Sequence, residues 1–352
     1  MISHRDAPHP LRVALITNGE KSYFKKHFYT YFNENSKLTL IDLCDSYDFN
    51  YNYQRVIKTV EQDNIDLCVF QMGDLALKLN HISQILCEKI CFISDDDWMY
   101  SIRTKYVSSY FNLLISTHEQ NKQQYIKDSI SNVIFSQYAC NTEIFKPLYL
   151  GKDIGVSLIG GPHADRPEII RFLVKNGIDI RIYGHGWSNI KDLRKYWYGY
   201  LTDIDMISII NRSKINLNPA KSSTMRGLQI KGRTFELAGC RAFQLTDKNH
   251  RINDYFVEDK EIVMYSNYSD LLSKVNFYLN HESEREEIAR LAYKRVIADH
   301  TWSNRFNDIF GGIKINRSIL KPLEPKKYRG NVALIYNARS SVVLNSTTVK
   351  CI

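Results

Sequence analysis

The sequence predicts an α/β protein with two Rossmann-like, doubly wound domains that face each other across a cleft. Short apolar runs alternate with polar, periodic segments over residues 11–136, and the alternation starts again at residue 154. Strands that alternate with helices indicate βαβ units and parallel sheets. The runs are apolar throughout, as expected of sheets that are covered on both faces. A chain of 352 residues is long enough to form two such cores.

The first domain is placed at residues 1–148. Helices are expected between its strands, for example over residues 53–64 and 118–129, where the sequence is polar and periodic. The predicted strands are the apolar runs 11–17, 37–43, 66–72, 89–94, 112–117 and 132–136.

The second domain is placed at residues 149–314. Its first helix is bracketed by Pro162 and Gly177, which are typical start and stop signals. Residues 315–352 are expected to be a linker and a strand-like segment that either docks on a sheet or begins a further module. The predicted strands cover 154–160, 178–184, 214–218, 241–246 and 261–265, and the helices cover 161–177, 202–213, 231–239, 301–313 and two segments within 267–298.

The charge of the chain is concentrated in its second half. Residues 1–150 carry 15 Lys and Arg against 17 Asp and Glu, whereas residues 151–352 carry 32 against 21, which gives net charges of −2 and +11. A basic half indicates an anionic ligand, such as a phosphate, a nucleic acid or a membrane surface. The basic residues are interspersed with others, as in a folded face rather than a basic tail.

The seven cysteines are scattered and complete no zinc-binding pattern, so reduced and mostly buried thiols are expected. No run approaches eighteen apolar residues, and the N-terminal segment lacks the features of a secretory signal. These observations predict a cytoplasmic protein without a membrane span, which leaves peripheral contact with a membrane open.

The first strand of the second domain ends in Gly160 and Gly161 and leads to Arg166 at a helix start. Glycines let backbone N–H groups approach a phosphate, and the helix N-terminus adds partial positive charge. A plain tight turn explains the two glycines equally well.

The segment 229–247 has a denser pattern. Lys231 and Arg233 stand at the start of a predicted helix, where cations oppose the helix dipole and would be stabilised by a bound anion. Glu236 lies in the apolar part of the same helix, where it could accept hydrogen bonds from ribose hydroxyls. The alternative is a salt bridge between Glu236 and Arg233.

Taken together, the stretches IYGHGW (182–187), YGYLTDIDMISIINRSKINLN (198–218), KGRTFELAGCRAFQLTD (231–247) and REEIARLAYKRVIADHTWSNRF (285–306) resemble the CgeB-like branch of the group 1 glycosyltransferases. ISDDDWMY (93–100) and VIFSQYACNTEIFKPL (133–148) resemble the N-terminal half of the same proteins. The likeness covers most of residues 12–313 and implies the GT-B fold and a bacterial enzyme that uses a nucleotide-diphosphate sugar.

The resemblance also implies roles for individual residues. One departure concerns Leu228, which stands eight positions before Glu236, where many group 1 enzymes have a further glutamate. This departure leaves the donor sugar and the stereochemical outcome open. The implied roles are a diphosphate loop at Gly160, Gly161 and Arg166, a nucleobase pocket at Gly184 and Tyr200, a diphosphate clamp at Lys231 and Arg233, a ribose-binding carboxylate at Glu236, and a donor-sugar loop at Thr246 and Asp247.

Asp95, Asp96 and Asp97 follow a predicted strand of the first domain and are expected at its carboxyl end. Neighbouring carboxylates repel each other, which favours a general base for an acceptor hydroxyl. Two alternatives stay open: capping of the next helix, and binding of a divalent metal by Asp95 and Asp97. His118 also follows a strand, where a structural role is the commoner one.

These features predict a glycosyltransferase with a nucleotide-sugar donor and an acceptor that is a glycan, a lipid-linked glycan or a protein, in surface polysaccharide, spore or protein glycosylation. No metal or further cofactor is expected, because cationic side chains would already neutralise the diphosphate. The alternative functions are a non-catalytic sugar-nucleotide-binding protein and a nucleic-acid-binding protein. The sequence disfavours the latter, since it has neither an arginine-rich stripe nor an aromatic ladder.

Overall fold

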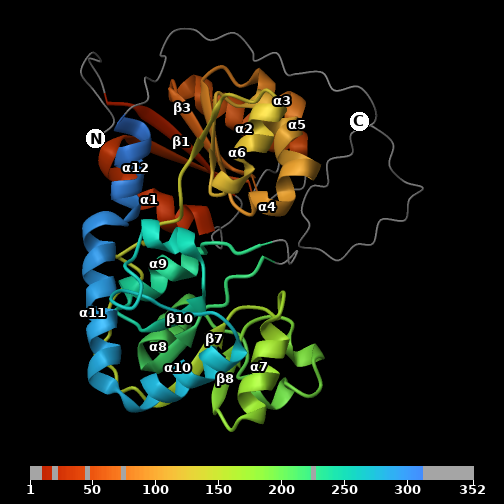
Figure 1. Cartoon of the computed structure of the whole chain (residues 1–352). Coiled ribbons are helices and arrows are strands. Elements are labelled where there is room, and N and C mark those ends of the chain that lie inside the picture. The colour runs from red at the N-terminus through yellow and green to blue at the C-terminus, as the bar shows by residue number, and fades with distance from the viewer. Residues whose placement is uncertain (1–9, 18–22, 44–47, 73–76, 223–226, 312–352) are drawn as a thin grey trace. The chain divides into compact units, whose positions relative to one another are not determined.

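The computed structural model describes residues 10–17, 23–43, 48–72, 77–222 and 227–311 (Figure 1). Within them the chain forms two compact units, one from residues 10–137 with 305–311 and the other from residues 138–304. The linker and strand-like segment predicted at 315–352 lie outside the described residues. No helix of the described part combines the length and the apolar character needed to cross a membrane.

The first unit contains a six-stranded parallel sheet in the order β2-β1-β3-β4-β5-β6. All six predicted strands are present: β1, β3, β4 and β5 are mostly buried, whereas the edge strands β2 and β6 are more exposed. The elements are β1 (Arg12–Thr17), α1 (Tyr23–Asn35), β2 (Lys37–Asp42), α2 (Phe49–Gln62), β3 (Leu67–Gln71), α3 (Leu79–Gln84), β4 (Glu88–Ile93), α4 (Asp96–Met99), a π-helical turn (Tyr100–Thr104), α5 (Lys105–Val107), β5 (Leu113–Ser116), α6 (Lys122–Lys127) and β6 (Val133–Phe135).

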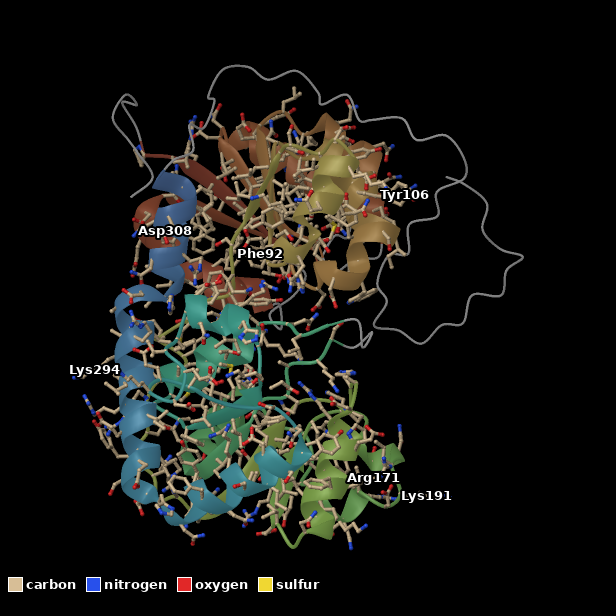
Figure 2. All side chains as sticks on the ribbon, viewed as in Figure 1. Phe92, Tyr106, Arg171, Lys191, Lys294 and Asp308 are labelled. Atoms are coloured by element: carbon tan, nitrogen blue, oxygen red, sulfur yellow. The ribbon has the colours of Figure 1, made fainter. Side chains whose placement is uncertain are left out.

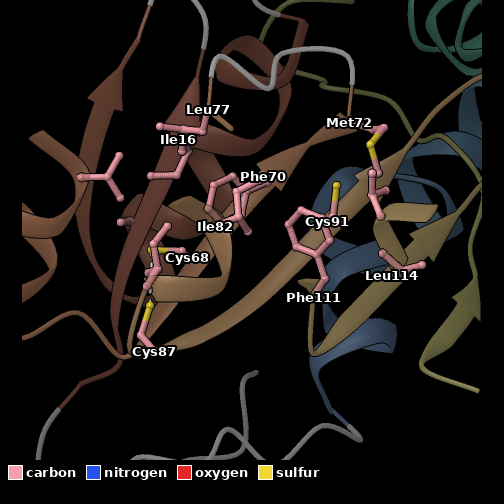
Figure 3. Packing of buried hydrophobic residues seen from close by; sticks show 14 of the residues in the cluster. Ile16, Cys68, Phe70, Met72, Leu77, Ile82, Cys87, Cys91, Phe111 and Leu114 are labelled. Carbon is pink, nitrogen blue, oxygen red and sulfur yellow. Dashed lines mark hydrogen bonds between the residues drawn. The ribbon is translucent and has the colours of Figure 1, made fainter. Parts of the chain in front are cut away.

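One hydrophobic core of this unit lies between the sheet and helices α2, α3, α5 and α6. It includes Val56 from α2, Ile82 from α3 and Val107 from α5, all nearly inaccessible to solvent. Figure 3 shows its strand side, where Cys68, Phe70 and other buried side chains pack together. The free cysteines among the described residues are buried, as expected of reduced thiols that behave as small apolar side chains.

The opposite face of the first sheet is covered by α1 and by α12 (Trp302–Gly311). Rings of the two helices interlock: the centroids of Tyr31 and Phe306 are 4.9 Å apart, and those of Phe32 and Phe310 are 5.7 Å apart. The Tyr31 hydroxyl also donates to Asn307 Oδ1 at 3.3 Å. Residues 305–311 therefore pack with the first unit, whereas the sequence analysis places the whole segment up to residue 314 in the second.

The second unit contains a five-stranded parallel sheet in the order β11-β10-β9-β7-β8. Its predicted strands and helices are all present. The elements are β7 (Ile154–Ile159), α7 (Arg166–Lys175), β8 (Ile180–Tyr183), α8 (Asp203–Arg212), β9 (Ser213–Leu217), α9 (Gly232–Gly239), β10 (Gln244–Asp247), β11 (Val263–Tyr265), α10 (Tyr268–Asn280) and α11 (Glu282–Asp299).

Both faces of this sheet are covered, as the uniformly apolar strands require. On one face, Leu173 of α7 and Leu271 of α10 pack on strand residues such as Val156. On the other, Ile210 of α8 and Phe235 of α9 form a separate core.

The unit begins at Tyr138, eleven residues before the predicted boundary at residue 149. Cys140 and Phe145 belong to the core on the α8 and α9 face. Gly239 at the end of α9 approaches both so closely that a methyl group there would collide with the Cys140 thiol and lie 3.0 Å from the Phe145 carbonyl oxygen. Because it packs into this core, the segment that follows residue 137 belongs to the second unit.

Candidate functional site

The topology of the second sheet indicates where a ligand would bind. From β7 the chain turns to β8 on one side, then crosses back to β9 on the other, and β7 and β9 pair directly. The strand order thus reverses between β7 and β9, and this position is called the switch point of the sheet. Open parallel sheets bind ligands at a switch point, beyond the carboxyl ends of the strands. The loop after β7, residues 160–165, and the loop after β9, residues 218–221, border this switch point.

The loops after β7 and β8 approach each other through two glycines. Gly160 and Gly184 have φ angles of +147° and +123°, which favour glycine. Trp187 Nε1 donates to the Gly160 carbonyl at 2.7 Å, and Trp197 Nε1 donates to the Gly184 carbonyl at 3.0 Å. The local backbone therefore favours glycine at Gly160 and Gly184. The contact of Gly160 with a phosphate and that of Gly184 with a nucleobase stay predictions.

Arg166, the first residue of α7, spans the switch point. Its Nη1 donates to the Gly161 carbonyl at 2.9 Å, and its Nη2 donates to the Pro219 carbonyl at 3.4 Å. Burial, followed by the nearby positive charge of Arg233, lowers the pKa of Arg166 to about 10. The guanidinium thus links the two loops from a buried position and lies close enough to Arg233 for the two charges to repel each other.

Lys231 occupies the N-cap position of α9. Its ammonium donates to the Pro219 carbonyl at 2.9 Å and to the Lys221 carbonyl at 3.1 Å. Lys231 and Arg166 therefore share one acceptor, the carbonyl of Pro219. The structure brings these two predicted cations together on the loop after β9.

Arg233 and Glu236 form the ion pair that the sequence analysis gives as an alternative. Arg233 Nη1 lies 2.9 Å from Glu236 Oε2, and Glu236 is 4 % exposed. Partial burial strengthens such a pair relative to one on the surface. The role of Glu236 in binding a ribose stays a prediction.

Thr246 and Asp247, at the end of β10, also hold the loop after β9. Thr246 Oγ1 donates to the Asn218 carbonyl at 2.8 Å, and Asp247 Oδ2 accepts from the Ala220 backbone N–H at 2.5 Å. Burial raises the pKa of the Asp247 carboxyl above its ordinary value. Both predicted residues thus lie at the sheet edge beside the switch point.

One ion pair that crosses the switch point was not predicted from the sequence. Lys221 Nζ lies 2.5 Å from Asp165 Oδ2, with the Lys221 side chain 38 % exposed and that of Asp165 8 % exposed. The signal was available in part, because Lys221 follows β9 by four residues and Asp165 directly precedes α7. Parallel strands bring such positions to the same edge.

Tyr200 lies beside the loop that follows β8. Its ring centroid is 4.2 Å from that of His185 and 5.3 Å from that of Trp197, and 55 % of Tyr200 is exposed. An exposed, rigidly backed ring can stack on a flat ligand. The role of Tyr200 at a nucleobase stays a prediction.

The acidic segment of the first unit separates into three environments. Asp96 is fully buried and accepts hydrogen bonds from Ser116 Oγ at 2.8 Å and Tyr125 OH at 2.7 Å. Asp97 Oδ1 lies 3.8 Å from His118 Nε2. Asp95 is exposed, with φ of +57°, and its side chain makes no capping hydrogen bond to α4 within the described residues. Asp96 therefore fixes α4 to β5 and α6.

No group of three or more His, Cys, Asp or Glu side chains in the described ranges is placed to hold a metal ion. The Asp95 and Asp97 alternative would thus need ligands from elsewhere, since divalent cations take several oxygen ligands.

Comparison with known proteins agrees with this architecture. The family described as "Glycosyl transferase-like" matches residues 166–311. The spore protein CgeB of Bacillus subtilis (strain 168) is 26 % identical over an alignment of 211 residues, and the match covers 53 % of this chain and 64 % of that protein. The match thus spans less than two thirds of the length of CgeB.

Solved structures show the fold. HepE of Anabaena in complex with UDP and glucose has a TM-score of 0.57 at 9 % identity, with 86 % of this chain and 100 % of that chain covered. Sucrose-phosphate synthase from Thermosynechococcus elongatus has a TM-score of 0.60 at 9 % identity, with coverages of 86 % and 98 %. The expected fold and resemblance are therefore confirmed: the chain has the GT-B fold and is similar to the spore protein CgeB.

Proposed function

We propose that the protein is a glycosyltransferase that moves a sugar from a nucleotide-diphosphate sugar to an acceptor hydroxyl. The observation that carries this proposal is the cationic edge of the second sheet, where Arg166, Lys221, Lys231 and Arg233 surround the β7–β9 switch point. The family match over 166–311 and the similarity to HepE, which was solved in complex with UDP and glucose, support it.

In the proposed reaction, the acceptor oxygen forms a bond to the anomeric carbon of the sugar. The bond from that carbon to the diphosphate oxygen breaks, and the nucleoside diphosphate leaves with the bonding electrons. The cationic side chains and the N-terminus of α7 stabilise its negative charge. No divalent metal is required in this proposal, because these groups neutralise the leaving group.

The hydroxyl proton passes to a carboxylate of the acidic segment. Asp97 is the best candidate among the three, because Asp96 is occupied by Ser116 and Tyr125, while Asp97 lies near the titratable His118. The acceptor is proposed to be a glycan, a lipid-linked glycan or a protein of the bacterial surface or spore.

A thermal-shift screen of UDP, GDP, dTDP, ADP and CMP with their common sugar conjugates tests the donor. A ligand that binds the native state raises the unfolding temperature. We expect a nucleoside diphosphate to stabilise the protein in the presence of EDTA. Release of nucleoside diphosphate from the matching sugar donor would then establish turnover.

The double variant Lys231→Ala with Arg233→Ala is expected to abolish the thermal shift. A shift that survives in it would contradict the cationic site, and a shift that needs added Mg²⁺ or Mn²⁺ would contradict metal independence. Binding without release of nucleoside diphosphate, over a broad set of acceptors, would favour a non-catalytic binding protein instead.

A further inference from the structure

We propose that Lys221 is the lysine that contacts the donor diphosphate, that Asp165 holds it in the unliganded protein, and that Arg166 and Lys231 act as positioning residues for its loop. This inference rests on the proposed function and deepens it, because it assigns the contact to a residue that the family resemblance did not indicate.

The two predicted cations, Arg166 and Lys231, both donate hydrogen bonds to the backbone of the loop after β9. Arg166 and Lys231 both donate to the Pro219 carbonyl, at 3.4 and 2.9 Å, and Lys231 also donates to the Lys221 carbonyl at 3.1 Å. These N–H groups thus bind the backbone of residues 219–221. A charged donor on a carbonyl is a strong hydrogen bond, so the two side chains fix the path of this loop.

The backbone of Lys221 is held in place by hydrogen bonds of its neighbours. Lys221 pairs with Leu228 in an antiparallel bridge, and hydrogen bonds flank it on both sides, from Ser222 N to Gly227 O and from Gln229 N to Ala220 O, both at 2.9 Å. Asp247 holds the preceding residue by accepting from the Ala220 N–H. Lys221 therefore leaves a fixed backbone, so little ordering of the chain is needed when its side chain binds a ligand.

The side chain of Lys221 is partly exposed to solvent. The Lys221 side chain is more exposed than those of Arg166 and Arg233, and its ammonium is paired with Asp165, which is almost completely buried. The hydrogen bond to Asp165 raises the pKa of Lys221, so the ammonium is charged at neutral pH. A ligand that arrives at the switch point therefore meets a charged lysine whose partner is a carboxylate.

In the proposed complex, the diphosphate replaces Asp165 as the partner of the Lys221 ammonium. Asp165 directly precedes α7, so the Lys221 ammonium is already held beside the N-terminus of a ten-residue helix. An oxygen of a diphosphate can replace the carboxylate oxygen as its acceptor and is favoured by the same helix dipole. Since Asp165 competes for the ammonium, the pair should weaken diphosphate binding in the native protein while keeping Lys221 in position.

Isothermal titration of the full chain with UDP, GDP, ADP and dTDP tests the inference in a double-mutant cycle. We expect Lys221→Gln to weaken the nucleoside diphosphate that wild type binds by about tenfold or more, the range of a charge-assisted hydrogen bond. Asp165→Asn should tighten it by about threefold, and Asp165→Asn should have no effect in the Lys221→Gln background. Lys221→Arg should retain most of the affinity.

Lys294→Gln is the matched control, because this lysine of α11 is exposed and points outward in Figure 2. It should leave the affinity unchanged. Equal affinity of wild type and Lys221→Gln, or a gain from Asp165→Asn that persists without Lys221, would overturn the inference while leaving the proposed function intact. If wild type binds none of the four diphosphates, the proposed function fails, and this inference fails with it. Unfolding temperatures measured without ligand separate a folding defect from a binding defect.

Discussion

A methyl group on Gly184 would lie 2.9 Å from the carbonyl carbon and oxygen of Gly160. The loops that follow β7 and β8 are thus in backbone contact. A side chain on Gly184 would displace Gly160, and a side chain on Gly160 would displace the Arg166 guanidinium, which would lie 2.6 Å away. This contact fixes one border of the candidate site, because Gly160 begins the segment that leads to Arg166.

Gly184→Ala should lower the free energy of unfolding by about 1–3 kcal/mol, since it combines an unfavourable φ with a steric clash. It should also weaken nucleoside-diphosphate binding, because the loop after β7 must shift. Chemical denaturation and titration calorimetry measure the two effects. Gly151→Ala is the control, since a methyl group there has no described neighbour within 4 Å. Equal stability of the two variants would contradict the close approach.

Asp96→Ala should destabilise the protein by about 2–4 kcal/mol, because it leaves the buried hydroxyls of Ser116 and Tyr125 without their shared acceptor. Asp95→Asn should change stability by less than about 0.5 kcal/mol, because Asp95 is exposed and asparagine also tolerates its positive φ. Urea unfolding of the two variants compares them directly. If Asp96→Ala folds as stably as wild type but loses activity, Asp96 is catalytic rather than positioning.

The raised pKa of Asp247 predicts a pH dependence of stability. A carboxyl whose folded-state pKa is raised binds its proton more tightly in the native state. Its contribution is therefore most favourable at a pH below the ordinary pKa of about 4 and declines as the pH rises through the folded value. Asp247→Asn should remove this decline, so its stability relative to wild type should grow with pH. Unfolding curves between pH 4 and 8 check the sign, and a difference that shrinks with pH would contradict it.

Phe306→Ala should cost about 3–5 kcal/mol, the range for removing a buried aromatic ring. Phe306 is 1 % exposed and packs against Phe28, Tyr31 and Phe32 of α1. Limited proteolysis should cut the variant near α12 at a concentration that leaves wild type intact. Ile204→Ala on the exposed surface of α8 serves as the control. An unchanged digestion pattern would mean that α12 does not depend on these rings.

The strands and helices could be predicted because their signals are local. Each predicted apolar run is five to seven residues long and forms a strand, and the start of α7 follows Pro162 as expected. The site required contacts between distant segments. Lys221 and Asp165 are 56 residues apart, and their pairing follows from the order β9-β7, which no single segment encodes.

The same limit explains the differences in domain boundaries and in the acidic segment. Tyr31 of α1 packs against Phe306 of α12, although the residues of the second unit separate the two helices in the sequence. Neither helix has a sequence feature that indicates the other as its packing partner. Asp95, Asp96 and Asp97 are chemically equal in the sequence, but the turn of α4 directs Asp96 inward to Ser116 and leaves Asp95 exposed. Their separate environments depend on the residue at which α4 begins, because this decides which side chain faces inward. The sequence alone does not fix that residue.

The return of α12 to α1 makes the first unit discontinuous, with residues 138–304 inserted in it. During synthesis on the ribosome, nearly all of the inserted unit is made before α12, the helix that covers Tyr31 and Phe32. The part of the protein that is synthesised first therefore matures last, and a nascent chain stalled before Trp302 would present an aromatic surface to chaperones and proteases.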